Sequence, residues 1–463
     1  MLNCFVTKED TNAKPIALVA QRDIDAWINK QNEFTRNWLV ASGFKSDIGN
    51  FSLIPNKVGQ LSQVVCCVAD NTLLWNVGHL PCVLPDGTYY FSNIDAVAYA
   101  EYAIAWGLGS YQFTRYKTQT KQPAVLYLTE SVDENYISNC VQSIYFVRDL
   151  INTPTEDMGP TELAEVVEAL GKYYHANTTQ IIGEALLKNN YASIYTVGRA
   201  SDDVPRLLDL RWGKPDHPKL TLVGKGVCFD SGGLDLKNAS GMLLMKKDMG
   251  GAAHVLGLAR MVMQAHLPVR LRVLIPAVEN VISGNAYRPG DVIQSRKGLT
   301  IEIGNTDAEG RVVLADALTE AVSEQPELLI DMATLTGAAR IALGTELPAV
   351  FCNQDQLVNE LLQHATDQAD PLWRLPLFPL YKDALGSGIA DLNNASADAY
   401  GGAITAGLFL KEFVPDQIPW LHFDIMAWNL KSRPGRPQGG EAMGLRALFS
   451  YLRKRFSVAD SAD

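Results

Sequence analysis

The stretch KLTLVGKGVCFDSGG at residues 219–233 joins a short apolar strand to a glycine-rich end that carries charged side chains. Its first part, 219–224, has the apolar character of a buried strand. Outward from it, strands and helices alternate: a helix is predicted at 249–265, a strand at 269–278, a helix at 311–323 and a strand at 327–333. Apolar strands separated by such helices indicate a largely parallel sheet covered on both faces. Ligands of such sheets bind beyond the carboxyl ends of the strands, so the residues after each strand are the candidates for chemistry.

A smaller domain is expected before this sheet. The chain has 463 residues, which at roughly 100–200 residues per domain allows about two to four domains. Predicted strands at 63–68 and 124–128 and a predicted helix at 94–108 indicate mixed α/β structure there. We therefore expect an α/β protein with a small N-terminal α/β domain at 1–130, a linker helix at 131–151, and a larger domain at 152–463 with a mostly parallel central sheet flanked by helices.

The linker helix has clear sequence limits. Residues 134–151 have a helical pattern, and Pro154 breaks the helix shortly after its end. The next helix is predicted to begin near Thr161, with that threonine as its cap.

Composition and charge narrow the class of protein. Hydrophobic residues make up 47% and charged residues 20%, which is ordinary globular usage and excludes a disordered or collagen-like chain. Acidic residues number 51 against 40 Lys and Arg, for a net charge of −11. This acidity disfavours non-specific binding to nucleic acids or anionic membranes. Residues 1–130 also lack a dense Lys/Arg cluster with interleaved aromatic residues, which disfavours a DNA-binding role for that region.

Targeting and cysteine patterns indicate the compartment. No apolar run approaches the ~18–20 residues needed to cross a bilayer, and the start MLNCFVTKEDTNAK has no signal-peptide pattern. The seven cysteines are scattered and form no Cys-x-x-Cys pair, which disfavours a disulfide framework or a thiolate zinc site. We expect a cytoplasmic protein that does not associate with membranes.

The glycine-rich segment after strand 219–224 is the first candidate site. GKGVCFDSGG at 224–233 has four glycines in ten residues, which permits tight backbone turns. It fails the dinucleotide pattern, because Phe229 occupies the third glycine position, and it also fails the Walker pattern. The charged residues Lys225, Asp230 and Lys237 remain to be explained.

Asp248 precedes the small residues Gly250 and Gly251 at the start of the predicted helix 249–265. Aspartate is a favoured helix cap, so a purely structural role is open for Asp248. Small residues in the first turn would also let this helix end approach a site closely.

Asp307 and Glu309 follow the predicted strand 299–303 (LTIEI). In an extended chain, residues two apart point the same way, so the two carboxylates would face one point, with Arg311 next on that side. Like charges facing together repel unless a cation or a proton lies between them. The alternative is a solvated acidic turn before the helix at 311–323.

Together these segments supply four carboxylates, which suggests an oxygen-rich metal site with room for bridging ligands. The seven histidines are dispersed, and no His-Glu-x-x-His pair occurs. A mononuclear histidine-based zinc hydrolase is therefore disfavoured.

Three segments closely resemble those of one known family. They are GKGVCFDSGG…K…MKKDMGGAAHVLG at 224–257, NTDAEGRVVLADAL at 305–318 and ATLTGAARIALG at 333–344. That family is the leucine aminopeptidase (cytosol aminopeptidase) family. Further similarity lies in RDLINTP (148–154), GGAITAGLFLKEFV (401–414) and WLHFD (420–424). The resemblance covers roughly residues 145–463, and the order and spacing of the three main segments match as well. It makes 152–463 the expected catalytic metallopeptidase domain.

The resemblance implies a leucyl-aminopeptidase-type enzyme that removes the N-terminal residue from peptides with a free N-terminus. It implies two divalent ions per subunit, Zn²⁺ or Mn²⁺, which activate the attacking water. Asp230 and Glu309 would bridge the two ions, Asp307 would complete one site, and Lys225 and Asp248 the other. As a neutral ligand, Lys225 would need a strongly lowered pKa, which two nearby cations can enforce.

The family also implies the remaining roles. Lys237 would act as the electrophile that hydrogen-bonds the substrate carbonyl, and Arg311 would hold a bicarbonate that serves as general base. The residues implied to bind substrate are Met245, Asn305, Thr334, Leu335 and Gly337. A homohexamer is expected by resemblance only.

Two departures from the family pattern concern the pocket. Leu243 and Leu244 replace an acidic pair that the family usually has, and the stretch after Asp424, IMAWN, is shortened against the family's pattern. Both departures affect the expected side-chain preference. From the residues alone, a binuclear phosphatase or nuclease stays open as the alternative, since such enzymes use similar carboxylates.

Overall fold

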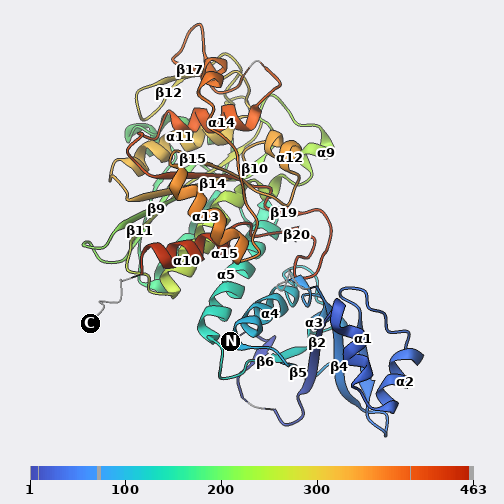
Figure 1. Cartoon of the computed structure of the whole chain (residues 1–463). Helices are drawn as coiled ribbons and strands as arrows, with labels where there is room; N and C mark the ends of the chain where they lie inside the picture. The colour runs from blue at the N-terminus through green and yellow to red at the C-terminus, as the bar shows by residue number, and fades with distance from the viewer. Residues whose placement is uncertain (1, 9, 70–74, 397, 458–463) are drawn as a thin grey trace. The chain divides into compact units, whose positions relative to one another are not determined.

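The computed structural model describes residues 2–8, 10–69, 75–396 and 398–457 (Figure 1). The chain forms two compact units. One consists of Met1–Tyr145 with Lys431–Gln438, and the other of Phe146–Leu430 with Gly439–Asp463. The division falls inside helix α5 (Glu134–Asn152). The expected domain limits at 130 and 151 remain predictions.

The first unit is built on a six-stranded sheet in the order β1-β6-β5-β2-β4-β3. All neighbouring strands are parallel except the antiparallel pair β3 and β4. Its strands are β1 (Phe5–Val6), β2 (Lys14–Ala20), β3 (Phe51–Pro55), β4 (Leu61–Val68), β5 (Thr88–Ser92) and β6 (Val125–Tyr127). Its helices are α1 (Ile24–Asn29), α2 (Glu33–Ala41), α3 (Leu80–Val83) and α4 (Ala96–Gly109).

Helix α4 forms much of the core of this unit. It is apolar around most of its circumference, and Trp106 is fully buried. Trp106 and Tyr99 each make an edge-on ring contact with Phe91 of β5. The predicted strands at 63–68 and 124–128 and the predicted helix at 94–108 are confirmed to within a few residues.

The second unit contains a nine-stranded sheet, whose main path runs β16-β15-β18-β14-β9-β11-β8-β7. The central strands β18, β14, β9 and β11 are parallel, and β10 pairs parallel with β11. On either side of this centre, β15 pairs antiparallel with β18 and β8 pairs antiparallel with β11, and β7 in turn pairs antiparallel with β8. The structure thus confirms the expected α/β fold with a mostly parallel sheet.

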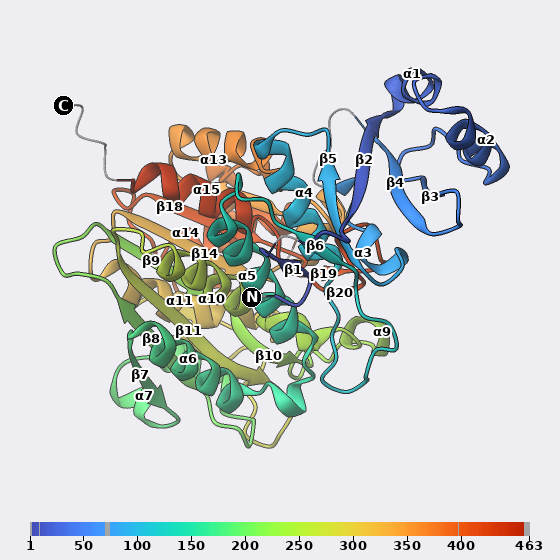
Figure 2. The same cartoon turned by 90° about the horizontal axis from the view of Figure 1, so that it is seen from below.

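Helices cover both faces of this sheet, as Figures 1 and 2 show. Helices α6, α10, α13 and α15 lie on one face, and α8, α11 and α14 on the other. The strands are β7 (Asn177–Ile182), β8 (Arg206–Trp212), β9 (Lys219–Gly224), β10 (Gly226–Asp230), β11 (Arg270–Asn280), β14 (Leu328–Ala333), β15 (Ala349–Cys352), β16 (Trp373–Arg374) and β18 (Trp420–Asp424). The helices are α6 (Pro160–Tyr174), α7 (Ala185–Lys188), α8 (Ala192–Gly198), α9 (Ala239–Met242), α10 (Gly250–Gln264), α11 (Glu309–Val322), α12 (Gly337–Leu343), α13 (Asp355–Asp367), α14 (Gly402–Lys411) and α15 (Leu445–Arg455).

Two small sheets complete the unit. Strands β12 (Val292–Gln294), β13 (Thr300–Glu302) and β17 (Leu392–Asn393) form one, and β19 (Trp428–Asn429) pairs with β20 (Gly439–Gly440) in the other. Strand β17 lies parallel to β13, which brings the residues that follow both strands together.

The two helix starts lie within a residue of their predicted positions, but the predicted Thr161 cap is wrong, and so is the alternative of Asp248 as a cap. Helix α6 begins at Pro160 with Gly159 as its cap, because the ring of proline presets the first helical φ angle. Thr161 instead bonds Asp203 through its N–H and its hydroxyl. Asp248 does not cap α10 either, since the cap is Met249 and no side chain bonds it.

The start of α10 lies very close to the ends of strands β9 and β14. A Cβ built on Gly251 would lie 2.0 Å from the carbonyl oxygen of Met332. Only glycine permits this approach, which brings the segment before α10 to the carboxyl edge of the sheet.

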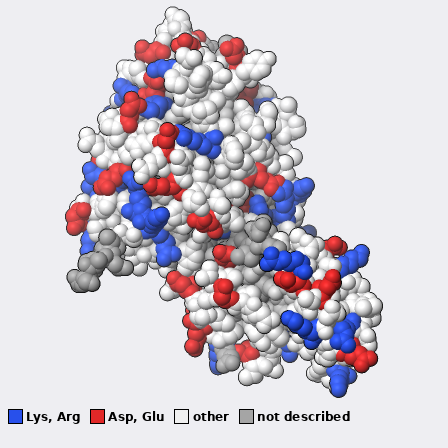
Figure 3. All heavy atoms as spheres, in the orientation of Figure 1, with Lys and Arg blue, Asp and Glu red and all other residues white. Residues whose placement is uncertain are grey.

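Among the described residues, no helix combines the length and the apolar character needed to cross a membrane. On the face drawn in Figure 3, acidic and basic side chains are interspersed, and no single basic patch covers it.

Candidate functional site

The predicted site residues of the second unit come from four segments at the carboxyl edge of the central strands. Lys225 lies between β9 and β10, and Asp230 is the last residue of β10. Asp248 lies in a 3-10 turn, Met245–Met249, just before α10. Glu309 is the first residue of α11.

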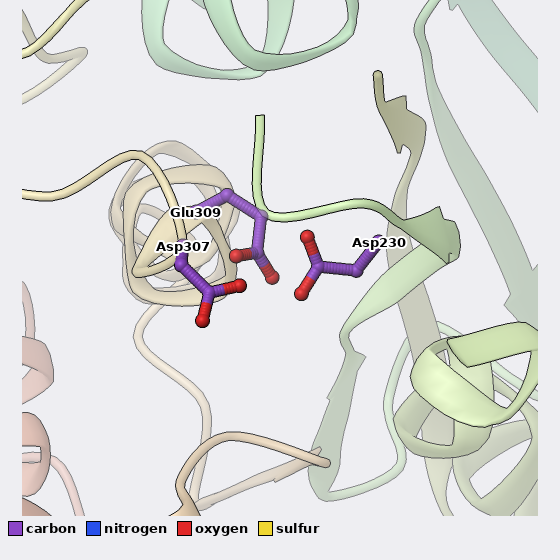
Figure 4. A group of neighbouring side chains, drawn as sticks. All are labelled: Asp230, Asp307 and Glu309. Atoms are coloured by element: carbon purple, nitrogen blue, oxygen red, sulfur yellow. The ribbon is translucent and has the colours of Figure 1, made fainter. Parts of the chain in front are cut away.

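Three carboxylates converge at this edge. One oxygen from each of Asp230, Asp307 and Glu309 lies within 4.8 Å of the others. Figure 4 shows their carboxylates pointing toward one another from the end of β10 and the start of α11. The prediction that Asp307 and Glu309 share a point is confirmed, but the predicted extended backbone is wrong. Asp307 lies in a turn, where its N–H donates to Asn305 Oδ1 at 2.7 Å, and Glu309 already belongs to the helix.

Two lysines form ion pairs with these acidic side chains and with Asp248. Lys225 Nζ lies 2.6 Å from Asp248 Oδ2 and 2.7 Å from Glu309 Oε1. Lys237 Nζ lies 2.8 Å from Asp230 Oδ2 and also pairs with Asp307. Because Lys225, Asp248 and Glu309 are all buried, their pairing is shielded from water and correspondingly strong.

The crowding of charges shifts the pKa values. Burial, with the neighbouring carboxylates, raises the pKa of Asp230 to about 6 and that of Glu309 to about 8. Burial acts the other way on Lys225, but Asp248 and Glu309 outweigh it and raise its pKa. Burial would also raise the pKa of Asp248, yet Lys225 and Lys247 hold it below the usual value.

The carboxylates fit a metal ion. Glu309 Oε2 is buried and has no hydrogen-bond partner among the described residues, an arrangement that costs free energy unless a cation binds there. Asp230 Oδ1 already accepts from the Gly232 N–H at 2.9 Å and from Asn280 Nδ2 at 2.8 Å. Its Oδ2, on the other side, is the oxygen that faces Lys237. The donor set of oxygens is the kind that hard divalent cations prefer.

Arg311 lies beside this group. Its side chain is buried, and Nη1 donates to the carbonyl oxygen of Asn394 at 2.8 Å. Its Nε finds no partner among the described residues. Burial lowers the pKa of Arg311 to about 10, against the opposing effect of Glu309 and Asp424, so the guanidinium stays charged at neutral pH.

The residues expected to bind substrate lie in the same segments as the carboxylates, as Met245 and Asn305 do, or just after strand β14. Thr334 is buried, and its hydroxyl donates to Asp248 Oδ1 at 2.7 Å. The N–H groups of Leu335 and Thr336 both donate to Asp424 Oδ1, at 3.0 and 3.1 Å. Met245 is buried in the turn before α10.

The two leucines that depart from the family pattern follow helix α9. Leu243 is 78% exposed and Leu244 is half-buried. Leu243 therefore adds an apolar surface rather than core packing.

Three polar residues that the sequence did not single out hold the site loops together. Thr306 is buried, its hydroxyl donates to the Gly232 carbonyl at 2.6 Å, and its N–H donates to Asp235. Asn280 bonds both Asp230 and the Thr306 carbonyl. Asn394 bonds the backbone of the turn that precedes Glu309. Of the three, only Thr306 could have been suspected from the sequence, because it lies inside the NTDAEGR segment that resembles the family.

Because Gly310 has no side chain, it leaves room for Lys225. We expect Gly310→Ala to lower kcat by at least about tenfold, because a small misplacement of a group at a catalytic site costs that much or more. A Cβ at Gly310 would lie 2.6 Å from Lys225 Cε and 2.7 Å from Nζ. The buried lysine would have to leave Asp248 and Glu309. Steady-state kinetics with added Mn²⁺ check this, with Gly388→Ala as the control, because that Cβ meets nothing within 4 Å. Unchanged kcat in Gly310→Ala would show that Lys225 does not need this position.

Comparison with known proteins identifies the family of the chain. The model of the cytosol aminopeptidase family, catalytic domain, matches residues 145–449, and the model of the M17 aminopeptidase N-terminal domain matches 14–129. A probable cytosol aminopeptidase from Clostridium perfringens is 38% identical over 367 residues, which are 75% of this chain and 74% of that protein.

Two solved structures are similar over nearly the whole chain. A cytosol aminopeptidase from Coxiella burnetii has a TM-score of 0.95 at 52% identity, covering 98% of this chain and 99% of that one. A bottromycin maturation enzyme in complex with Mn has a TM-score of 0.85 at 31% identity, covering 96% of this chain and 100% of that one. The chain belongs to the cytosol aminopeptidase family and is a metal-dependent aminopeptidase with that family's N-terminal and catalytic domains.

Proposed function

We propose that this aminopeptidase is of the leucyl type, acts on peptides with a free N-terminus, and uses two divalent ions, Zn²⁺ or Mn²⁺, held by the four carboxylates and Lys225. The observation that carries the proposal is the convergence of Asp230, Asp307 and Glu309, with a buried Glu309 oxygen that has no hydrogen-bond partner in the part of the chain that the structure describes. The manganese complex of the similar bottromycin maturation enzyme supports the choice of metal.

The ligands divide between two positions. Asp230 and Glu309 lie between the two lysines and would bridge the ions, with Asp307 on the Lys237 side and Asp248 on the Lys225 side. When bound, such ions lower the pKa of a coordinated water toward neutrality and attract the carbonyl oxygen and free amine of a peptide. Lys225 would lose its proton in their field and serve as a neutral ligand.

Lys237 is proposed to act as the electrophile. Its side chain is 16% exposed, which leaves it open to a substrate bound beside the carboxylates. Burial lowers its pKa, but Asp230 and Asp307 outweigh burial and raise it. A lysine that stays protonated can donate a hydrogen bond to the carbonyl oxygen as negative charge develops on it.

Arg311 is proposed to hold a bicarbonate that serves as general base. A bicarbonate needs a cation and free N–H groups, and Arg311 offers a charged guanidinium whose Nε lacks a partner among the described residues. A planar guanidinium matches the geometry of a planar anion. Its role is to orient the base beside the carboxylates.

Substrate contacts are proposed for Met245, Asn305, Thr334, Leu335 and Gly337. The Leu335 N–H is already bonded to Asp424. Any backbone bond from Leu335 to a peptide would therefore use its carbonyl oxygen. The side-chain preference, a homohexamer and a cytoplasmic location rest on the family resemblance.

The expected result with leucine p-nitroanilide is cleavage that depends on added Mn²⁺ or Zn²⁺ and stops with a chelator. The matched substrate N-acetyl-leucine p-nitroanilide should not be cleaved, because it lacks the free amine. A phosphoester, p-nitrophenyl phosphate, should also stay intact. Cleavage of the acetylated anilide or of the phosphoester alone would contradict the proposed substrate class, and an alanine anilide cleaved faster than the leucine one would contradict the leucyl preference.

A further inference from the structure

Asn394 is a fully buried polar residue just after strand β17, outside every segment that the family resemblance singled out. Among the described residues, its side chain makes four hydrogen bonds, and all of them go to the backbone of residues 304–308. Oδ1 accepts from the N–H groups of Gly304 at 2.8 Å and Asn305 at 3.2 Å. Nδ2 donates to the carbonyl oxygens of Asn305 at 2.8 Å and Ala308 at 3.3 Å.

These bonds span the turn that carries the proposed ligands. They reach from its first residue to Ala308, which directly precedes Glu309, and Asp307 lies inside the span. The turn presents both N–H groups and carbonyl oxygens inward. Only an amide side chain offers an acceptor and two donors at once, so neither an aspartate nor an apolar residue could satisfy the turn.

Asn394 itself is held firmly. Strand β17 pairs with β13 through Ile301 with Leu392 and Glu302 with Asn393. The N–H of Asn394 then donates to the Glu302 carbonyl at 3.0 Å, which continues this pairing by one residue. This pairing fixes the position of Asn394, and therefore the position from which its amide bonds the turn.

The backbone of Asn394 makes a second functional contact. Its carbonyl oxygen accepts from Arg311 Nη1 at 2.8 Å. One residue thus fixes the turn with Asp307 and Glu309 through its side chain and the guanidinium of Arg311 through its main chain.

We propose that Asn394 is a positioning residue that couples the metal-ligand turn to Arg311. It acts through those groups and does not touch the substrate. The inference rests on the proposed ligand set, since it assigns Asn394 a role only if Asp307 and Glu309 bind the ions.

The test compares Asn394→Ala and Asn394→Asp with Asn353→Ala in the full chain. Asn394→Asp keeps the shape and the acceptor oxygen but loses both donated bonds, so it serves if the alanine variant does not fold. Asn353 is the matched control. It also bonds backbone across the fold, to Ile418 and Trp420, but at the opposite end of β18 from Asp424.

The expected result is a fall of about 10- to 100-fold in kcat and in Mn²⁺ affinity for both Asn394 variants, the usual cost of losing an outer-shell partner. KM for leucine p-nitroanilide should change by no more than about twofold, because substrate contacts persist. Mn²⁺ affinity is measured by calorimetry on the metal-free protein, and kcat at saturating Mn²⁺. If Asn394 had a purely structural role, its variants would have a lower unfolding midpoint, but their kcat and Mn²⁺ affinity would match those of Asn353→Ala.

The outcomes separate this inference from the proposed function. If the Asn394 variants match Asn353→Ala in kcat and Mn²⁺ affinity while Glu309→Gln is inactive, the positioning role is overturned and the ligand set stands. If Glu309→Gln keeps full activity, the ligand set fails and the role of Asn394 fails with it.

Discussion

Glu309→Gln is expected to lower kcat for leucine p-nitroanilide by at least about 10³-fold, because a bound ion contributes several kcal/mol of transition-state stabilisation. Of the carboxylates that the structure describes, Glu309 is the one that contacts Lys225 and also lies within 4.8 Å of Asp230 and Asp307. The amide keeps the shape of the side chain but removes the charge that would bridge two cations. Steady-state kinetics with added Mn²⁺ give the measurement.

The fold should survive this change. Burial, together with repulsion from Asp230, raises the pKa of Glu309 and so disfavours its charged form. An uncharged glutamine avoids both costs, so the metal-free variant should be at least as stable as the parent chain. Glu320→Gln is the control on the same helix, since Glu320 pairs with Arg272 and Arg296 instead of the site carboxylates. A Glu309→Gln enzyme with near-normal kcat would remove Glu309 from the metal site.

The metal-free chain is expected to lose stability as pH rises from about 5 to 9. Folding raises the pKa of Asp230 from 3.8 to about 6 and that of Glu309 from 4.5 to about 8. The folded state therefore binds more protons than the unfolded state in this range, so the stability is present below the unfolded pKa values and is lost as pH passes about 6 and then 8. The loss should be on the order of a few kcal/mol.

Bound ions should reverse this trend. They take the place of the protons, and deprotonated ligands bind them more tightly as pH rises. An ion at roughly 1,000 times its Kd adds about 4 kcal/mol, which corresponds to a rise in Tm on the order of 10 °C. The measurement is calorimetric unfolding with EDTA and with Mn²⁺ from pH 5 to 9. The Tm with Mn²⁺ should exceed the Tm with EDTA by a difference that grows with pH.

A control separates this effect from other titrations, such as that of buried Asp316, whose pKa burial also raises to about 6. In metal-free Glu309→Gln the loss of stability above pH 6 should be smaller than in the parent chain. The proposed site of converging carboxylates would be contradicted by a metal-free Tm that does not fall as pH rises. It would also be contradicted by a constant difference in Tm between the Mn²⁺ and EDTA samples.

The central sheet could be predicted because its strands are short apolar runs separated by helices. The same pattern directed attention to strand ends, where Asp230 and Lys225 lie. Strands β7 and β8 were not predicted, since they lie toward the sheet edge and mix polar with apolar residues. Their periodicity is too weak to distinguish from a loop.

The supporting residues of the site could not be predicted in the same way. Asn394 and Asn280 act by bonding the backbone of distant loops, and nothing in their spacing marks that role. Asp248 had two readings, cap or ligand. Only the structure shows its carboxylate bonded to Lys225 and Thr334 instead of capping α10.

A crystal structure grown with Mn²⁺, with anomalous data collected near the manganese edge, tests the metal site most directly. The expected result is two anomalous peaks about 3.5–4 Å apart, with Asp230 and Glu309 between them, Asp307 on one and Asp248 with Lys225 on the other. A single peak, or peaks whose ligands exclude Glu309 and Asp230, would contradict the binuclear site.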